Sequence, residues 1–297
     1  MSMAGIGLPE LYCSARGTHL VDVFKSIAAL KEARHDWDRP VGLVPTMGYL
    51  HEGHIELVRR ARAEAKTVVV SIFVNPTQFG PSEDFARYPR DFERDLELLR
   101  QAGTDAVLAP SAEDMYPAGF STWVDVEGVT ATLEGARRPG HFRGVATVCN
   151  KLFNIVAPDR AYFGQKDAQQ VAVIRRMVTD LNMNLEIVVL PIVREPDGLA
   201  MSSRNIYLSP AERQAATVLY RALTEAREMY WHGVTDAEVV RRRMRQIVDA
   251  EPLAELDYAT IVTADAFQET ETIDEGSLAV IAARLGRARL IDNMYLA

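Results

Sequence analysis

The chain has 297 residues, 48% of them hydrophobic, and a formal net charge of −8. This composition supplies enough apolar side chains for a buried core and excludes wholesale disorder, and the length is sufficient for two domains. The negative charge disfavours a nucleic-acid partner, because a broad nucleic-acid-binding surface needs an excess of basic side chains.

Cysteine usage and the N-terminal segment indicate a cytoplasmic protein. Cys13 and Cys149 are too few for a disulfide framework and form no C-x-x-C pair, which is typical of a reducing compartment. Residues 1–17 do not combine a basic segment with a long apolar stretch, so we expect no signal peptide. No apolar run approaches the roughly 18 residues of a membrane span, and we expect no membrane partner.

The first periodic segments predict a βαβ unit. The run VGLVPT (41–46) is a candidate for a short buried strand, and TVVVSIFVN (67–75) is a second candidate, rich in β-branched residues. Between them, residues 53–65 carry apolar side chains at helical spacing. Two strands joined by a helix in this way should be parallel, with a right-handed connection.

The same alternation continues to residue 190 and predicts the fold class. Helical spacing recurs at 91–101, 143–156 and 168–182, and strand-like runs occur at 105–110, 121–128, 161–164 and 185–190. Alternating strands and helices are typical of an α/β protein with a doubly wound, mainly parallel sheet. We therefore expect a domain of this class at residues 1–190.

After residue 190 the pattern changes and predicts a smaller α+β domain at residues 191–297. Residues 191–205 contain two prolines, one glycine and little periodicity, which is typical of a linker or an active loop. The expected elements that follow are capped helices starting at Ser209 and Thr235, a strand at 256–265, and a hairpin at 277–294 that turns near Gly286.

Two histidines, His51 and His54, stand in PTMGYLHEGH (45–54), where the first predicted strand meets the first predicted helix. A zincin helix needs H-E-x-x-H, so the spacing in H-E-G-H disfavours a metal site. The pair is also compatible with polar residues that satisfy a helix start. A third interpretation is phosphate binding, because α/β sheets bind ligands at the carboxyl ends of strands and helix N-termini favour anions. Gly48 and Gly53 would then let the backbone approach the ligand.

Two later segments favour the phosphate interpretation. FGQKD (163–167) follows a short predicted strand and places Lys166 and Asp167 before a helix. MSSRN (201–205) adds two hydroxyl groups and the guanidinium of Arg204. Each segment alone is typical of a solvated surface or a turn. Together with the histidine pair, they indicate a triphosphate-binding site at one edge of the sheet.

Long, ordered motifs make the sequence similar to the pantoate–β-alanine ligase (pantothenate synthetase) family. PTMGYLHEGH resembles the family's form of the HIGH motif of class I aminoacyl-tRNA synthetases. Four further segments resemble family segments, and the similarity extends from about residue 40 to the end: VSIFVNPTQFG (70–80), HFRGVATVCNKLFNIVAPDRAYFGQKDAQQ (141–170), VREPDGLAMSSRNIYLS (193–209) and ARLGRARLIDN (283–293). The resemblance implies a Rossmann-like fold and ATP-dependent condensation of (R)-pantoate with β-alanine through a pantoyl adenylate, releasing pyrophosphate and AMP.

The resemblance also implies roles for individual residues. His54, His51, Lys166 and Arg204 would be catalytic, as hydrogen-bond donors and cations around the phosphates. Gln78 and Gln170 would hold pantoate, and Gln78 would also lie near β-alanine. The implied ATP contacts are Met47, Gly48, Tyr49, Leu50, His51, Glu52, Gly53, His54, Gly164, Gln165, Lys166, Asp167, Val193, Met201, Ser202, Ser203 and Arg204.

Further implications concern the metal ion, the assembly state and departures from the family pattern. Mg²⁺ would be held mainly by the triphosphate rather than by a protein metal site. The protein would be a homodimer, with the apolar strand VVVSIFV (68–74) near its interface. Gln165 stands where many members carry Glu, Arg94 stands where some carry an acidic residue, and Asp95 would lie near the pyrophosphate.

Two other functions compete with this interpretation. A nucleotidylyltransferase of the same superfamily would stop after nucleotidyl transfer to a phosphorylated acceptor, but Gln78 and Gln170 disfavour it, because a phosphorylated acceptor would favour Arg or Lys. A non-catalytic RNA-binding relative of a synthetase is disfavoured by the net charge of −8.

Overall fold

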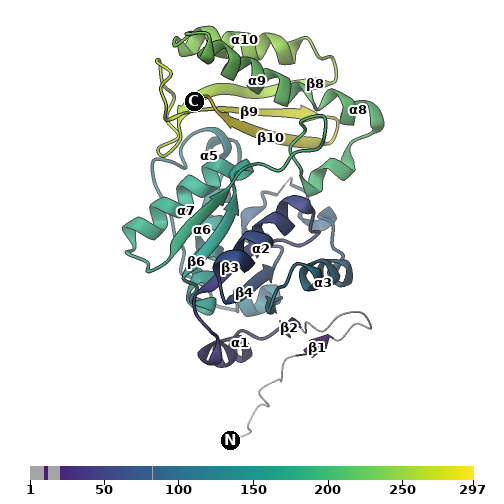
Figure 1. Ribbon diagram of the computed structural model, residues 1–297, viewed down its shortest axis with the longest axis vertical. Helices are drawn as coiled ribbons and strands as arrows, with labels where there is room; N and C mark the ends of the chain where they lie inside the picture. Colours follow the sequence, from purple (N-terminus) through teal and green to yellow (C-terminus); the bar gives the residue numbers. More distant parts are fainter. Residues whose placement is uncertain (1–9, 13–20, 82) are drawn as a thin grey trace, which may run out of the picture. The chain divides into compact units, whose positions relative to one another are not determined.

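The computed structural model describes residues 10–12, 21–81 and 83–297, so Cys13 lies outside the described residues. It contains a seven-stranded sheet with the order β1-β2-β5-β4-β3-β6-β7 and a three-stranded sheet with the order β10-β9-β8 (Figure 1). The strands of the large sheet, in chain order, are β1 (Glu10–Tyr12), β2 (Val21–Phe24), β3 (Val41–Thr46), β4 (Thr67–Ile72), β5 (Ala106–Leu108), β6 (Arg160–Gly164) and β7 (Glu186–Leu190).

The pairing of the large sheet confirms the predicted doubly wound, mainly parallel architecture. Parallel ladders join β2 to β5, β5 to β4, β4 to β3, and β3 to β6, and the short β1 pairs antiparallel with β2. The helices of this part of the chain are α1 (Ile27–Ala33), α2 (Glu52–Glu64), α3 (Phe92–Gln101), α4 (Ala112–Met115), α5 (Leu133–Arg137), α6 (His141–Val156) and α7 (Ala168–Asp180).

The predicted βαβ unit forms β3, α2 and β4. Helix α2 turns Ile55, Val58 and Ala61 toward the sheet, and Figure 1 shows it lying along β3 and β4. The valines 68–70 of β4 are completely buried, and each such side chain contributes roughly 1.5–3 kcal/mol relative to full exposure. Because β4 lies between β3 and β5, its apolar residues are buried within this sheet, and the expectation that the strand is near a dimer interface stays a prediction.

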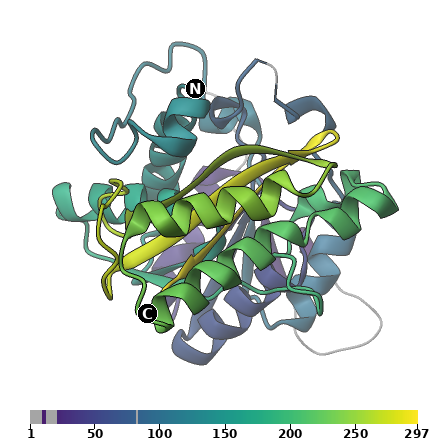
Figure 2. The ribbon, with the colours of Figure 1, turned by 90° about the horizontal axis from the view of Figure 1, so that it is seen from above.

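The smaller sheet and its helices confirm the predicted C-terminal α+β region. Helices α9 and α10 pack together and cover the three antiparallel strands, as the green and yellow ribbons in Figure 2 show. Their apolar faces share one core, which includes Leu219, Val240 and Ile281. The elements are α8 (Pro210–Ala215), α9 (Val218–Trp231), α10 (Ala237–Asp249), β8 (Ala254–Thr263), β9 (Ser277–Leu285) and β10 (Ala288–Tyr295).

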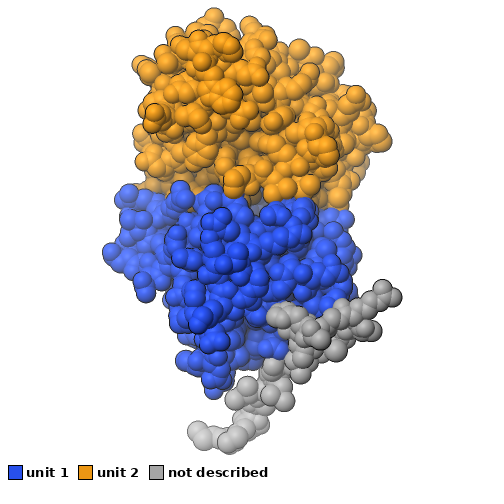
Figure 3. All heavy atoms as spheres, in the orientation of Figure 1, with its two compact units in different colours: residues 1–126, 138–163, 174–190 blue, residues 127–137, 164–173, 191–297 orange. Residues whose placement is uncertain are grey.

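The chain divides into two compact units, coloured in Figure 3. The first unit consists of residues 1–126, 138–163 and 174–190. The second unit consists of residues 127–137, 164–173 and 191–297, so it includes two segments from within the region 1–190. Consequently His51, His54 and Gln78 belong to the first unit, whereas Lys166 and Arg204 belong to the second.

Several predicted elements differ from the structure. Residues 121–128 form no strand, and the chain there has no partner strand among the described residues. The first capped helix starts as expected with a capping box at Ser209, but it is interrupted between α8 and α9. The cap of α10 is Asp236 rather than Thr235, since Asp236 accepts the amides of Glu238 and Val239. The sequence patterns did not predict β1, β2 or α1.

Across the described part of the chain, no helix combines the length and the apolar character needed to cross a membrane.

Candidate functional site

The first part of the candidate site lies at the carboxyl ends of two neighbouring strands. Thr46 and Ile72 are paired as the last residues of β3 and β4, so the loops that follow leave the sheet at the same edge. The Nε2 atom of Gln78, in the loop after β4, lies 3.0 Å from the Sδ atom of Met47 in the loop after β3. The structure therefore brings the predicted pantoate residue Gln78 to the segment that carries the two histidines.

His51 and His54 begin helix α2 and contact each other. His51 is the N-cap residue, and its backbone N–H donates to Nδ1 of His54 over 3.3 Å. The two ring centroids are 4.0 Å apart. Because Nδ1 accepts this bond, a neutral His54 ring carries its proton on Nε2 and is a hydrogen-bond donor at that atom. The positive end of the α2 dipole makes this position favourable for an anion.

The turn before the histidines is held by a buried carboxylate. Gly48 and Tyr49 have positive φ angles of 78° and 51°. The backbone amides of Tyr49 and Leu50 both donate to the side chain of Asp95, over 2.6 Å and 2.7 Å. Successive amides in such a turn form a concave anion site, and here the anion is the side chain of Asp95. A Cβ atom at Gly48 would lie 3.0 Å from Oδ2 of Asp95 and 3.0 Å from Cγ2 of Ile72, so the close approaches at this glycine are to two side chains of the protein.

Arg94 completes the support of this turn. Asp95 is only 1% exposed, and burial raises the pKa of its carboxyl group while hydrogen bonds from Leu50 and Tyr49 oppose the rise. Arg94 donates to the carbonyl oxygen of Leu50 over 2.9 Å, and its guanidinium lies 5.3 Å from the ring centroid of Tyr49. Asp95, which we expected near the pyrophosphate, therefore uses both oxygens on the protein backbone, and Arg94 acquires a structural role.

The amide of Gln78 has one orientation because Asn75 holds it. Asn75 is 1% exposed and donates through Nδ2 to Oε1 of Gln78 and to the carbonyl oxygen of Gly144, each over 3.1 Å. Its Oδ1 atom accepts from the hydroxyl groups of Thr77 and Tyr116, each over 2.9 Å. Since Oε1 of Gln78 is the acceptor, its NH₂ group is directed to the side of Met47.

A second group of residues holds the main chain of Gln78. Arg138 donates through Nη1 to Nε2 of His141 over 3.0 Å, and since a guanidinium only donates, the His141 ring has its proton on Nδ1. This Nδ1 atom lies 2.8 Å from the carbonyl oxygen of Gln78 and donates to it. Burial favours a neutral Glu83, but two 2.7 Å bonds from Arg138 prevail and keep the pKa of Glu83 below its usual value. The sequence analysis missed these three residues.

In the second unit, both predicted cations are carried on short helices that pack against one strand. Lys166 lies in the 3₁₀ helix η4 (Gln165–Asp167) and Arg204 in the 3₁₀ helix η5 (Ser203–Tyr207), and both helices contact β10. Ser202 caps η5 by accepting the amide of Arg204 over 3.2 Å. The structure therefore gives Lys166 and Arg204 a common support.

The segment before η5 is more ordered than the sequence suggested. Arg194 and Ala200 form an isolated antiparallel bridge, and the amide of Met201 donates to the carbonyl oxygen of Val193 over 3.0 Å. Gly198 turns this small hairpin with a φ angle of 92°, and a Cβ atom there would overlap the ring of Tyr220. The expected loop at 191–205 is thus a tight hairpin followed by η5.

The structure separates the roles of two adjacent glutamines. Gln169 is buried, donates to the carbonyl oxygens of Val129 and Thr132 over 2.8 Å and 2.9 Å, and accepts the amide of Glu134 over 3.0 Å. All of its polar groups are therefore used within the second unit. Gln170, the predicted pantoate residue, is half-buried and remains the candidate of the two.

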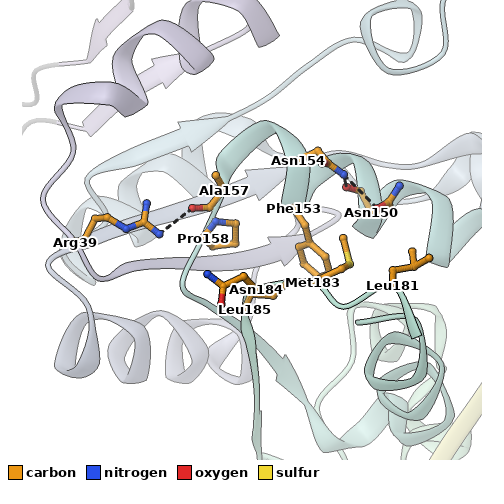
Figure 4. Close-up of a pocket in the computed structure, with 10 residues that line it drawn as sticks. All are labelled: Arg39, Asn150, Phe153, Asn154, Ala157, Pro158, Leu181, Met183, Asn184 and Leu185. Carbon is orange, nitrogen blue, oxygen red and sulfur yellow. Dashed lines mark hydrogen bonds between the residues drawn. The ribbon is translucent and has the colours of Figure 1, made fainter. Parts of the chain in front are cut away.

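A pocket of about 470 Å³ in the first unit lies apart from these residues (Figure 4). It is formed around the end of α6 and the segment after α7, with Phe153 and Met183 in its wall and Arg39 at one side. None of its ten lining residues is a candidate site residue. Its lining residues suggest no particular ligand, so we assign it no function.

Comparison with known proteins gives consistent matches over almost the whole chain. The family model described as pantoate-beta-alanine ligase matches residues 22–295. The pantothenate synthetase of Roseiflexus sp. (strain RS-1) is 60% identical over 274 residues, which is 92% of this chain and 99% of the relative. That of Herpetosiphon aurantiacus is 58% identical over 277 residues, which is 93% of this chain and 100% of the relative.

Two solved structures are also similar. Pantothenate synthetase from Thermus thermophilus has a TM-score of 0.89 and 51% sequence identity, covering 92% of this chain and 99% of that one. The pantoate-beta-alanine ligase from Francisella tularensis, complexed with beta-gamma ATP and beta-alanine, has a TM-score of 0.76 and 33% identity, covering 92% and 97%.

We predict that Asp95→Asn loosens the turn before the histidines. One asparagine oxygen cannot accept two amides, and a buried amide left without an acceptor costs about 1–3 kcal/mol. Hydrogen–deuterium exchange of the peptide that contains Tyr49 and Leu50 should therefore accelerate roughly tenfold or more. Glu93→Gln, the same charge change at an exposed position of α3, is the control. Equal exchange in both variants would show that Asp95 does not hold the turn.

We also predict that Gly144→Ala displaces the loop that carries Gln78. A Cβ atom at Gly144 would overlap the carbonyl group of Thr77 and lie 2.7 Å from the amide nitrogen of Gln78. Such overpacking costs about 1–3 kcal/mol, so the melting temperature should fall. Calorimetric titration should show weaker pantoate binding, with ATP binding as the internal reference. An unchanged pantoate affinity would contradict the assignment of Gln78.

Proposed function

The chain belongs to the pantoate–β-alanine ligase family, and we propose how its residues divide the work of this reaction. The enzyme is a ligase that condenses pantoate with β-alanine in an ATP-dependent reaction and forms the amide bond of pantothenate. The observation that carries this conclusion is the family match over residues 22–295, together with 60% identity to a relative over nearly its full length.

We propose that the reaction passes through an adenylate. A carboxylate oxygen of pantoate attacks the α-phosphorus of ATP and expels pyrophosphate. The amine of β-alanine then attacks the acyl carbon, loses a proton and expels AMP. Such attack needs positioning and charge stabilisation more than a protein nucleophile. In keeping with this, burial raises the pKa of Cys149 to about 12, so this thiol is not a ready nucleophile.

The two histidines and the two cations would act on the phosphates. The tautomer that the His51 amide imposes leaves His54 with an Nε2–H group, so we assign His54 as a hydrogen-bond donor to charge that develops on phosphate oxygens. His51, at the same helix start, would assist it. Lys166 and Arg204 would neutralise phosphate charge, and both are carried on segments that share β10 as a support.

We propose that ATP contacts the residues that the family resemblance implies. The residues concerned are the implied ones: Met47–His54, Gly164–Asp167, Val193 and Met201–Arg204. In the first unit, the support for this assignment is the start of α2, where the dipole and His54 favour an anion. In the second unit, it is the pair of 3₁₀ helices η4 and η5.

Gln78 and Gln170 would hold pantoate, and Gln78 would also approach β-alanine. An uncharged amide offers both a donor and an acceptor, which suits a hydroxy acid. Because Asn75 takes the Oε1 atom of Gln78, we assign the NH₂ group of Gln78 as the donor to the substrate.

We propose that Mg²⁺ arrives on the triphosphate and neutralises part of its charge. Hard divalent cations of this kind prefer phosphate oxygens and water. Among the described residues, no group of three or more His, Cys, Asp and Glu side chains is arranged to hold a metal ion. The protein's own contribution would then be the donors and cations named above. We also propose a cytoplasmic location, which agrees with the low cysteine count.

Pantoate-dependent exchange of labelled pyrophosphate into ATP, without β-alanine, tests the proposal. An adenylate intermediate predicts exchange under these conditions and AMP release only after β-alanine is added. A nucleotidylyltransferase would instead accumulate a stable nucleotidyl product and ignore the amine. Exchange that requires β-alanine would exclude a free adenylate as the first product.

We predict that His54→Ala and Lys166→Ala each lower this exchange rate about 10²- to 10³-fold, as loss of a single transition-state donor does. Lys31→Ala, at an exposed position of α1, is the matched control for Lys166 and should exchange at the wild-type rate. A wild-type rate in either of the first two variants would remove that residue from the catalytic group.

We propose that the enzyme is a homodimer, with residues 121–126 as the contact. This segment belongs to no helix or strand, and the amide of Val124 donates to the Thr147 side chain. Trp123 in this segment is 37% exposed, and a large exposed apolar side chain of this kind can be buried against a second copy.

Light scattering during size-exclusion chromatography should therefore give twice the chain mass of 33.1 kDa, and Trp123→Glu should shift the mass toward a single chain. A single-chain mass for the wild type would exclude the dimer. A dimer unaffected by Trp123→Glu would place the contact elsewhere.

A further inference from the structure

Strand β10 carries two adjacent polar residues that are both buried. Asp292 and Asn293 are each 3% exposed, although β10 is an edge strand of the small sheet. Neither residue has a role in the reaction described above. Buried polar side chains persist when they are hydrogen-bonded, so their partners indicate what they do.

Asn293 uses its whole side-chain amide on the segment that carries Lys166. Its Nδ2 atom donates to the carbonyl oxygens of Gln165 and Lys166, each over 3.0 Å. Its Oδ1 atom accepts from Nε2 of Gln165, also over 3.0 Å. These three bonds connect positions more than 120 residues apart in the sequence, and they determine where the main chain at Lys166 lies.

Asp292 holds the other cationic segment in the same way. It accepts two bonds from Arg194, over 2.7 Å and 3.0 Å, and Arg194 also donates to the carbonyl oxygen of Gly198 in the hairpin before Arg204. Burial raises the pKa of Asp292, and the positive charges of Arg194 and Lys166 oppose this rise. The end of β10 therefore connects the Lys166 segment to the hairpin that precedes η5.

We propose that Asn293 is a positioning residue for adenylate formation, which acts by holding the main chain of Gln165 and Lys166 so that the Lys166 ammonium group meets the phosphates. This inference rests on the role proposed for Lys166. The chemistry of the contact specifies an amide, because the two carbonyl oxygens require two N–H donors from one side chain. An aspartate has nearly the same shape but presents only acceptors, so it would repel both carbonyl oxygens.

The test is a double-mutant cycle on the full-length enzyme, with pantoate-dependent pyrophosphate exchange as the rate. Asn293→Asp should lower kcat for exchange roughly 10- to 100-fold, since misplacing a catalytic group by about an ångström costs on the order of 10²-fold. The KM for pantoate should rise less than kcat falls, because Gln78 lies in the first unit and Gln170 is carried on α7, after the segment that Asn293 holds. Asn184→Asp, the same change at an exposed position outside the machinery, should exchange at the wild-type rate.

The cycle separates positioning from a general structural effect. If Asn293 acts through Lys166, adding Asn293→Asp to Lys166→Ala should cause almost no further loss of rate. Multiplicative losses in the double variant would overturn the proposal. If Lys166→Ala exchanges at the wild-type rate, the proposed role of Lys166 fails first, and the inference fails with it.

Asn293→Ala serves as a second variant if Asn293→Asp does not fold, because it removes the donors without adding charge. It should show the same loss of kcat, and its melting temperature should fall, because the carbonyl oxygens of Gln165 and Lys166 lose their donors. A folded Asn293→Ala enzyme with wild-type kcat would also overturn the proposal.

Discussion

The candidate site depends on one constraint, that main-chain polar atoms in buried turns need hydrogen-bond partners. The segments that carry the predicted substrate contacts leave strand ends, where the sheet no longer supplies partners. In each case a side chain from a distant segment supplies them. Asp95 accepts two amides of the turn before the histidines, His141 donates to the carbonyl oxygen of Gln78, and Asn293 donates to the carbonyl oxygens of Gln165 and Lys166.

The residues therefore fall into two groups. One group would contact the substrates, and the other group holds the residues of the first group in position. The first kind, such as His54, Lys166 and Arg204, lies on short helices or helix starts. The second kind is buried. Burial disfavours the ionised forms of its carboxyl groups and raises the pKa values of Asp95 and Asp292. Their hydrogen bonds and the neighbouring Arg94 and Arg194 offset this effect of burial. Reaction by positioning and charge stabilisation requires such rigid support, since the donors must already be in place when charge develops.

Local periodicity explains which elements were predicted correctly and which were not. Strand β3, helix α2 and helix α6 were predicted because the spacing of apolar residues within each of these short segments is enough to indicate its structure. The alternation at 121–128 failed because a strand also needs a neighbour to pair with, and the described chain offers none there. Strand β2 was not predicted, although with four residues it is longer than β5, which was.

The sequence by itself determined the fold class, the family and the residues that bear the proposed chemistry, because periodicity and contiguous motifs are local properties of the chain. Only the tertiary structure decided what holds those residues in place. The bond from Tyr49 to Asp95 spans 46 positions, that between Gln78 and His141 spans 63, and that from Gln165 to Asn293 spans 128. A hydrogen bond acts over about 3 Å of space, and the distance along the chain does not reveal which residues come that close.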